Sequence, residues 1–291
     1  MKTPTQILLV LAVALSGCSK SDDNKSTTLK GVVSKGLVAH AQVDIYQIEN
    51  KTLQNTPFIS TQTDETATFH ITLKDVPQVV YITVTGMKDA STLAQCDLLE
   101  CGTATRSELD SNNNGVTDFG EWQSVPEEFQ LTAWIGNWNG NDPISVNPFT
   151  HALARTFSTP PSAEELEAAY VSLQERFSLS QRADLITVVD VTGTELDTQQ
   201  LQDQLMSASL LAVYSNSSSM TEALAAITAS DQSILEQSET ELTQLALTLA
   251  SSIDRDPYTD ITNELQALNA QAAVDENRLS YKDIPVLPPL L

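Results

Sequence analysis

Residues 68–85, TFHITLKDVPQVVYITVT, decide the fold of the first half of the chain. Apolar and polar side chains alternate on both sides of the turn at residues 75–77, and this period of two is typical of β-strands that bury one face. The polar positions Thr68, His70 and Thr72 take the outer face. The inward positions are Phe69, Ile71, Leu73, Val80, Ile82 and Val84. The stretch therefore predicts two neighbouring strands of an antiparallel sheet.

The same period extends toward the N-terminus. Val32, Val43 and Ile45 fall on inward positions of further short runs, and polar turn residues separate these runs. Several short strands at this spacing favour a small antiparallel β-sandwich over residues 29–95.

The second half of the chain has a helical period. Ser162 and Glu165 form a capping box, and an apolar stripe follows at Leu166, Ala169, Tyr170, Leu173 and Phe177. Residues 201–214 are apolar on most faces, so we expect this helix at the centre of a bundle. The predicted fold class is α+β, with an N-terminal antiparallel β-sandwich, a connector and a C-terminal helical bundle. The expected boundaries are a signal peptide at 1–17, a flexible tether at 18–28, the sandwich at 29–95, the connector at 96–161, the helical domain at 162–280 and a Pro-rich tail at 281–291.

The charge balance narrows the range of partners. The chain has 38 Asp and Glu against 15 Lys and Arg, for a formal net charge of −23. A chain this acidic is repelled by nucleic acid and by anionic lipid surfaces, and it attracts cations. We therefore expect no nucleic-acid partner.

The N-terminal sequence predicts an export signal. The apolar run Ile7–Leu15 has the length of a signal-peptide core, and it leads into Leu15-Ser16-Gly17-Cys18. This ending resembles the cleavage signal of bacterial lipoproteins, which implies that Cys18 carries the lipid and becomes the first mature residue. An ordinary signal with an incidental cysteine is the alternative. Ser19, by resemblance to Gram-negative lipoproteins, implies an outer-membrane location with the lipid as the contact to the membrane.

The strand region also resembles a known family. Gly31-Val32-Val33, residues 36–46 (GLVAHAQVDIY) and Thr63-Asp64 leading to Phe69-His70-Ile71 are similar to carboxypeptidase-regulatory-like, or transthyretin-like, sandwich modules. The resemblance covers about sixty residues. It implies a spacer or binding module without catalysis.

Two further cysteines remain in the exported part, Cys96 and Cys101. An even number of cysteines in an exported chain favours a disulfide. Two free thiols or half of a metal site are the alternatives.

Residues 110–121, DSNNNGVTDFGE, fit the pattern of an EF-hand calcium loop. Calcium prefers hard oxygen ligands, and alternate residues of a tight loop present them inward. Gly115 provides the sharp turn, where a Cβ is expected to obstruct the backbone. Thr117 and Pro126 argue against a paired sensor hand, so the sequence predicts a lone structural site; a generic Asn-rich turn is the alternative. The predicted ligands are Asp110, Asn112, Asn114, the carbonyl of Val116, Asp118 and Glu121.

Three tryptophans lie close together in the sequence, Trp122, Trp134 and Trp138. Trp134 and Trp138 share a face if the segment is helical, and flat rings suit glycan binding. The alternative is a small aromatic core, because Trp is mostly buried.

We find no catalytic motif: the three histidines form no metal-binding spacing, and no nucleophile elbow is present. A glycosidase-type carboxylate pair stays open, because its spacing depends on the fold. The leading hypothesis is a non-enzymatic, lipid-anchored envelope protein with a structural calcium site and a protein or glycan partner. The alternative function is a glycan-binding lipoprotein that uses the tryptophan region.

Overall fold

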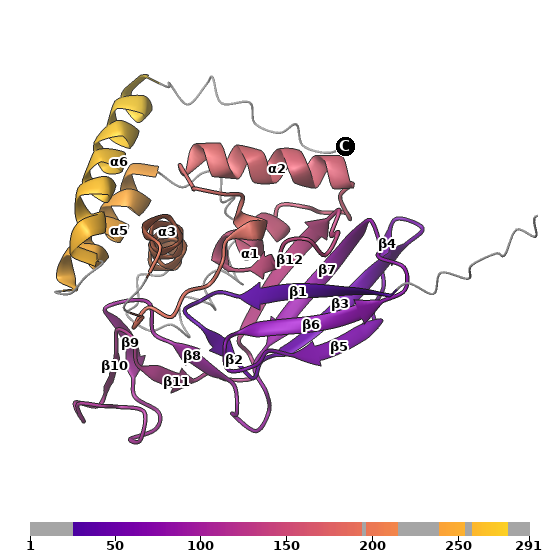
Figure 1. Cartoon of the computed structure of the whole chain (residues 1–291), viewed down its shortest axis with the longest axis horizontal. Helices are drawn as coiled ribbons and strands as arrows, with labels where there is room; N and C mark the ends of the chain where they lie inside the picture. The colour runs from indigo at the N-terminus through magenta and orange to yellow at the C-terminus, as the bar shows by residue number, and fades with distance from the viewer. Residues whose placement is uncertain (1–25, 194–195, 215–238, 254–257, 279–291) are drawn as a thin grey trace, which may run out of the picture.

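The computed structural model describes residues 26–193, 196–214, 239–253 and 258–278 (Figure 1). The expected signal peptide, Cys18, most of the expected tether and the expected tail lie outside these ranges. No helix in the described ranges has the length and apolar character needed to cross a bilayer.

Strands come first in the chain and helices follow, so the α+β class is confirmed. The strands are β1 (Thr27–Val33), β2 (Val38–Ala39), β3 (Gln42–Glu49), β4 (Thr52–Leu53), β5 (Ile59–Gln62), β6 (Thr68–Leu73), β7 (Val79–Thr85), β8 (Leu93–Gln95), β9 (Glu100–Thr103), β10 (Val116–Asp118), β11 (Trp122–Ser124), β12 (Gln130–Gly136) and β13 (Ile144–Val146). The helices are α1 (Pro148–Ala154), α2 (Ala163–Arg176), η1 (Ala183–Leu185), α3 (Thr198–Tyr214), α5 (Glu239–Ser252) and α6 (Tyr258–Arg278).

Two larger sheets contribute side chains to the first hydrophobic core. One has the order β13-β1-β6, and in the other β3 lies between β7 and β5, with β12 on the far side of β7. The expected inward residues of β6 and β7 are all buried in this core, as the period-two pattern predicts. Of the expected outer residues of β6, His70 and Thr72 are exposed, but Thr68 is buried, so its expected place on the outer face is corrected. Gly31 of β1 lies under the ring of Phe69, and a Cβ at this position would overlap the ring.

Residues 96–161, expected to be a connector, contribute two strands to these sheets. β12 pairs with β7 along its whole length, from Gln130↔Thr85 to Gly136↔Val79. β13 pairs with β1 in a parallel orientation, a departure from the all-antiparallel arrangement that the sequence predicts. The sheets therefore draw on residues well beyond 95. The expected boundary at residue 95 is wrong because β12 is buried at successive positions and shows no alternating pattern.

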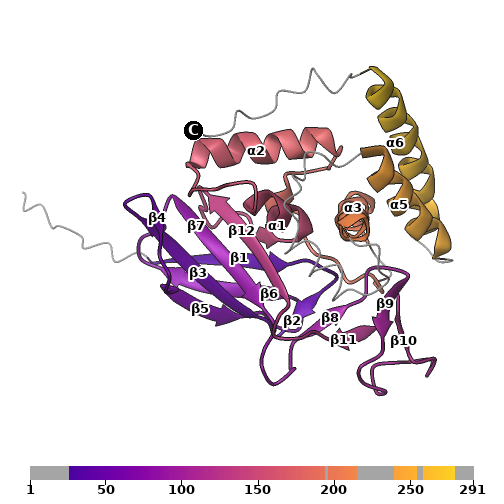
Figure 2. The same cartoon turned by 180° about the vertical axis from the view of Figure 1, so that it is seen from behind.

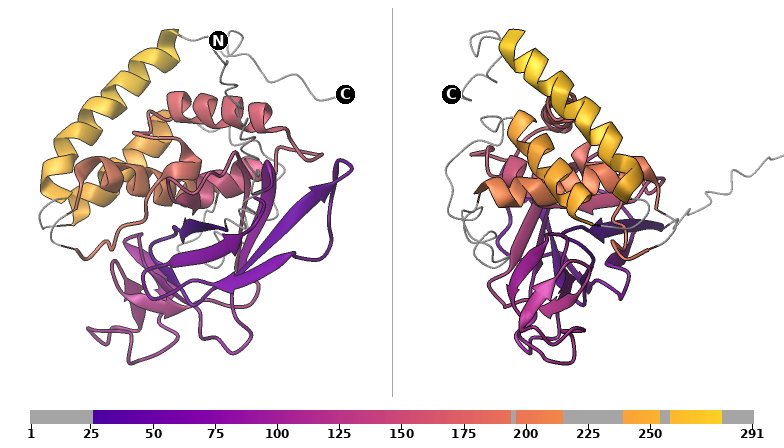
Figure 3. Two further views of the ribbon diagram at one scale, coloured as in Figure 1. Left: turned by 45° about the vertical axis from the view of Figure 1, so that its right-hand side comes forward. Right: turned by 90° about the vertical axis from the view of Figure 1, so that its left-hand side faces the viewer.

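β12 is buried on both faces, because one face packs into the first core and the other packs against the helices. Leu131, Ala133 and Ile135 point into the first core, whereas Trp134 points into a second core shared with α1, α2 and α3. The helices gather on one side of the strands in both views of Figure 3. The capping box of Ser162 and the apolar stripe of α2 are as predicted. Residues 201–210 of α3 are buried at nearly every position, as expected for a central helix.

Two small sheets form a separate end of the molecule. β8 lies between β2 and β11, and β9 pairs with β10. Figures 1 and 2 show β9 and β10 below α5 and α6, at the opposite end from β4. The candidate loop at residues 110–121 belongs to this end.

Candidate metal centre

The loop at residues 110–121 is anchored by strand pairing rather than by flanking helices. Its β10 pairs with β9, with Val116 opposite Thr103 and Asp118 opposite Glu100. Its last residue leads directly into β11. In a paired EF-hand, a second calcium loop supplies the partner for this short strand. Here the partner is β9, which is not part of a calcium-loop pattern.

The loop brings three of the predicted ligands together. The side-chain amides of Asn112 and Asn114 donate to the same oxygen, Oδ2 of Asp118, over 2.7 and 2.8 Å. Asp110 closes the turn from inside, because its carboxylate accepts from the backbone N–H groups of Asn114 at 3.2 Å and Gly115 at 2.8 Å. Asp110 is 7% exposed, so this carboxylate belongs to the interior of the loop.

Glu121 ties the end of the loop to its beginning. Its carboxylate accepts hydrogen bonds from the backbone N–H and the hydroxyl of Ser111, and from the backbone N–H of Asp118 at 3.0 Å. Burial raises the pKa of Glu121, but these hydrogen bonds outweigh burial and hold the pKa below its ordinary value. Glu121 is therefore a carboxylate near neutral pH, as a cation ligand must be.

Gly115 is needed for its backbone conformation and not for space. Its φ is +80°, in the left-handed region that favours glycine, and nothing lies within 4 Å of a Cβ built on it. The expectation that a Cβ would obstruct the turn is thus corrected. Asn113 has a φ of 59°, which asparagine tolerates better than most residues.

The donor set suits calcium in its chemistry, since carboxylate, amide and carbonyl oxygens are hard ligands. In the part of the chain that the structure describes, no three His, Cys, Asp or Glu side chains form a group that could hold a metal ion. The amides of Asn112 and Asn114 direct nitrogen toward Asp118, while their oxygens accept from the backbone N–H groups of Asn114 and Val116. A cation at this position requires both amides to turn.

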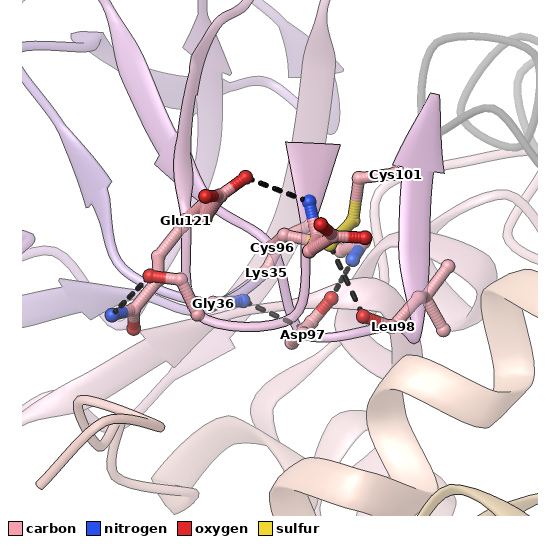
Figure 4. The surroundings of a disulfide bond; sticks show 10 residues. Lys35, Gly36, Cys96, Asp97, Leu98, Cys101 and Glu121 are labelled. Carbon is pink, nitrogen blue, oxygen red and sulfur yellow. Dashed lines mark hydrogen bonds and ion pairs between the residues drawn. A yellow bond between two sulfur atoms is a disulfide. The ribbon is translucent and has the colours of Figure 1, made fainter. Parts of the chain in front are cut away.

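The exit of the loop lies beside a disulfide. Cys96 is bonded to Cys101 with a Cα–Cα distance of 5.7 Å, the pairing that the cysteine count predicts. The backbone N–H of Cys96 donates to the carbonyl of Glu121 at 2.7 Å (Figure 4). The backbone N–H of Gly120 donates to the carbonyl of Cys96 at 2.8 Å. The loop is thus held through its last two residues to Cys96, which directly follows β8.

The same exit contacts the helical half of the chain. The ring of Phe119 meets the ring of Tyr258 edge to face, with centroids 5.4 Å apart. A Cβ on Gly120 would overlap the methyl group of Thr192. These contacts make the end of the loop part of the joint between strands and helices.

Gln95 adds polar contacts to this joint. Its side-chain amide donates to Asp190 at 2.7 Å and accepts from the backbone N–H of Val191 at 3.1 Å. The hydroxyl of Tyr258 donates to the carbonyl of Val191 at 2.8 Å. Sequence reasoning missed this joint, because its partners, such as Phe119 and Tyr258, lie far apart in the sequence and no local pattern marks them.

The tryptophans are core residues. Trp134 and Trp138 are each 5% exposed and belong to different cores. Trp134 lies on a strand, 4.6 Å from the ring of Tyr81 between centroids, and Trp138 packs edge to face on Phe69. Trp122 on β11 is half-buried. Stacking on a sugar requires an open ring face, so this burial favours the aromatic-core interpretation of Trp134 and Trp138.

His151 is also an interior residue. It is 1% exposed, and its Nδ1 lies 3.0 Å from the hydroxyl of Thr132. Burial, with the nearby charge of Arg155, lowers its pKa to about 4. A base of this strength with no access to solvent is poorly suited to catalysis at neutral pH.

The chain matches no protein-family model, no curated protein and no solved structure to which it was compared.

Proposed function

We propose that the protein is a non-enzymatic, lipid-anchored envelope protein in which residues 110–121 bind one calcium ion at the joint between strands and helices. In this proposal the lipid is attached at Cys18, the first mature residue, and holds the protein at the outer membrane. The two larger sheets act as a sandwich module of the carboxypeptidase-regulatory-like kind. In this proposal the complete protein acts as a binding or scaffold module for a protein or glycan partner in the envelope.

One observation carries the calcium part of the proposal. The loop that matches the calcium pattern is fixed on one side to Cys96 and β9 and contacts the helical half on the other, through Phe119 and Gly120. An ion that orders this loop therefore stabilises contacts on both sides of the joint. A structural role suits this position better than a sensor role, because strands flank the loop and no helix pair is present there to open.

The arrangement of the amides supports a weak site. Binding an ion requires Asn112 and Asn114 to turn their oxygens inward and to give up the hydrogen bonds that these oxygens accept from backbone N–H groups. Each such bond is worth about 1 kcal/mol. Two of the five side-chain ligands are also neutral. We therefore expect a dissociation constant of about 10⁻⁴–10⁻³ M, the range of extracellular calcium modules.

Thermal unfolding with and without calcium tests the site. Calcium at ten times its dissociation constant should stabilise the folded chain by about 1.4 kcal/mol, and a melting shift of roughly 2–4 °C follows for a chain of this size. Glu121→Gln should remove most of the shift, because it replaces a charged ligand with a neutral one.

Asn113→Gly is the matched control for this experiment. It keeps the left-handed backbone at the fourth position of the loop and removes a side chain that is not a predicted ligand. The control should retain the calcium shift. Equal shifts in the wild type and in Glu121→Gln, or no shift in either, would refute a calcium site in this loop.

The lipid anchor is tested separately. Cys18→Ser should abolish incorporation of labelled palmitate and leave an unprocessed precursor, because the thiol is the atom that the lipid joins. Labelled palmitate on the variant would show that Cys18 is not the lipidated residue.

A further inference from the structure

A lysine and an aspartate face each other in the interior beside the disulfide. The side chains of Lys35 and Asp97 are 0% and 2% exposed, and Nζ of Lys35 contacts Oδ1 of Asp97 (Figure 4). Lys35 lies in the turn between β1 and β2, and Asp97 follows β8. A buried ion pair is costly, because both charges lose their hydration.

The backbone around the pair is closely fitted. Gly36 has a φ of +60°, and a Cβ on it would collide with the carbonyl of Gln95. The backbone N–H of Gln95 donates to the carbonyl of Leu37 at 2.9 Å, which fixes the turn to β8. The bond between Cys96 and Cys101 closes the loop that carries Asp97. The two side chains are therefore held against each other by rigid neighbours.

Each group is prepared for reaction in a different way. Burial lowers the pKa of Lys35 to about 7, so a large fraction of the amine is neutral and nucleophilic near neutral pH. The other carboxyl oxygen of the aspartate, Oδ2, accepts a hydrogen bond from the backbone N–H of Gly36 at 2.7 Å. A donor at this oxygen stabilises the negative charge that develops on it when a nucleophile adds to the carboxyl carbon.

We propose that Lys35 and Asp97 condense into an intramolecular isopeptide bond that joins the β1–β2 turn to the loop after β8. Proton transfer within the pair gives a neutral amine and a carboxylic acid. Nζ of Lys35 adds to Cγ of Asp97, and Oδ2 takes the negative charge opposite the Gly36 N–H. The bond from Cγ to Oδ1 then breaks, and Oδ1 leaves as water with its own proton and one from the amine. The product is a neutral amide.

Two physical factors favour the amide over the ion pair. Oriented reactants within one molecule reach effective concentrations of about 10⁵–10⁸ M, which offsets the tendency of amides to hydrolyse in water. The product also removes two charges from a site without exposed surface, where an ion pair is poorly solvated. The crosslink and the disulfide would then tie the same loop to β1 and to β9.

Peptide mapping of the full chain after reduction, alkylation and trypsin digestion tests the proposal. Trypsin does not cleave at an acylated lysine. The expected product is therefore a branched peptide of residues 31–51 joined to residues 89–106, lighter by one water molecule than the sum of the two. Separate peptides 31–35, 36–51 and 89–106, with no branched species, would overturn the proposal.

Lys35→Met provides the control for water loss at another position. The variant lacks the nucleophile, so its peptide 89–106 should have the full mass of its composition. Peptide 89–106 of the variant could instead be lighter by one water molecule, or the wild type could yield an unbranched peptide 89–106 with this loss. Either result would place the loss of water within residues 89–106 and overturn the crosslink. If the variant does not fold, the presence or absence of the branched peptide in the wild-type map decides whether the crosslink forms.

Discussion

The burial of Asp203 predicts that the free energy of unfolding depends measurably on pH. It lies in α3 with 0% exposure, and its carboxylate accepts hydrogen bonds from the backbone N–H of Ser180 at 2.8 Å and from the Ser180 hydroxyl at 2.5 Å. Burial raises the pKa of Asp203 from 3.8 to about 6 despite these hydrogen bonds, and the charge of Asp197 adds to the rise. The folded chain therefore binds this proton more tightly than the unfolded chain does.

The sign and size of the effect follow from linkage. A carboxyl whose pKa is higher in the folded state favours folding most below the unfolded pKa, near 4. Its contribution falls as the pH rises and is fully lost above about 6. One pKa unit corresponds to 1.36 kcal/mol, so a shift of about two units corresponds to about 3 kcal/mol.

Asp203→Asn removes the charge and keeps an oxygen that accepts from the Ser180 N–H. Relative to the wild type, the variant should gain up to about 3 kcal/mol in free energy of unfolding between pH 4 and pH 7. Urea denaturation at both pH values measures this difference and cancels the other titrating groups. Asp197→Asn, an exposed residue at the start of the same helix, should change the pH dependence much less. Parallel pH profiles for the wild type and Asp203→Asn would refute the reasoning.

Three further substitutions test the packing and the joint by denaturation. Phe69→Ala opens a cavity in the first core next to Gly31 and Trp138, and it should cost about 3–5 kcal/mol; a loss below about 1 kcal/mol would contradict the packing. Tyr258→Phe removes the hydrogen bond to the carbonyl of Val191 and should cost about 1 kcal/mol, whereas unchanged stability would argue against this contact. Gly36→Ala should cost more than the roughly 1–2 kcal/mol of a left-handed backbone, because its Cβ also meets Gln95. A neutral effect there would show that the turn does not approach β8.

Local patterns predicted the elements that bury one regular face. Phe69, Ile71 and Leu73 of β6 alternate with the exposed His70 and Thr72, and Leu166, Tyr170 and Leu173 form one face of α2. Such periods are visible in sequence because a single buried face repeats every two residues in a strand and every three or four in a helix. The candidate calcium loop is predicted in the same way, from side chains at fixed spacing within twelve residues.

The parts that were missed depend on contacts between distant segments. β12 buries both faces, one in each core, so Trp134 and its neighbours show no clean alternation. The parallel pairing of β13 with β1 joins Ile144 to Gly31, and no local signal encodes it. Lys35 is a charged residue in a turn, and both features predict exposure from sequence. The structure instead buries it against Asp97, a contact between distant segments that no local pattern encodes.

The measurement that bears most directly on the proposed function is calorimetric titration of the mature, lipidated chain in detergent with calcium. The account predicts one ion per chain, a dissociation constant of about 10⁻⁴–10⁻³ M and loss of the binding heat in Glu121→Gln. The Asn113→Gly control should bind as the wild type does. No binding heat at millimolar calcium, or binding that Glu121→Gln leaves unchanged, would contradict a calcium site at the joint.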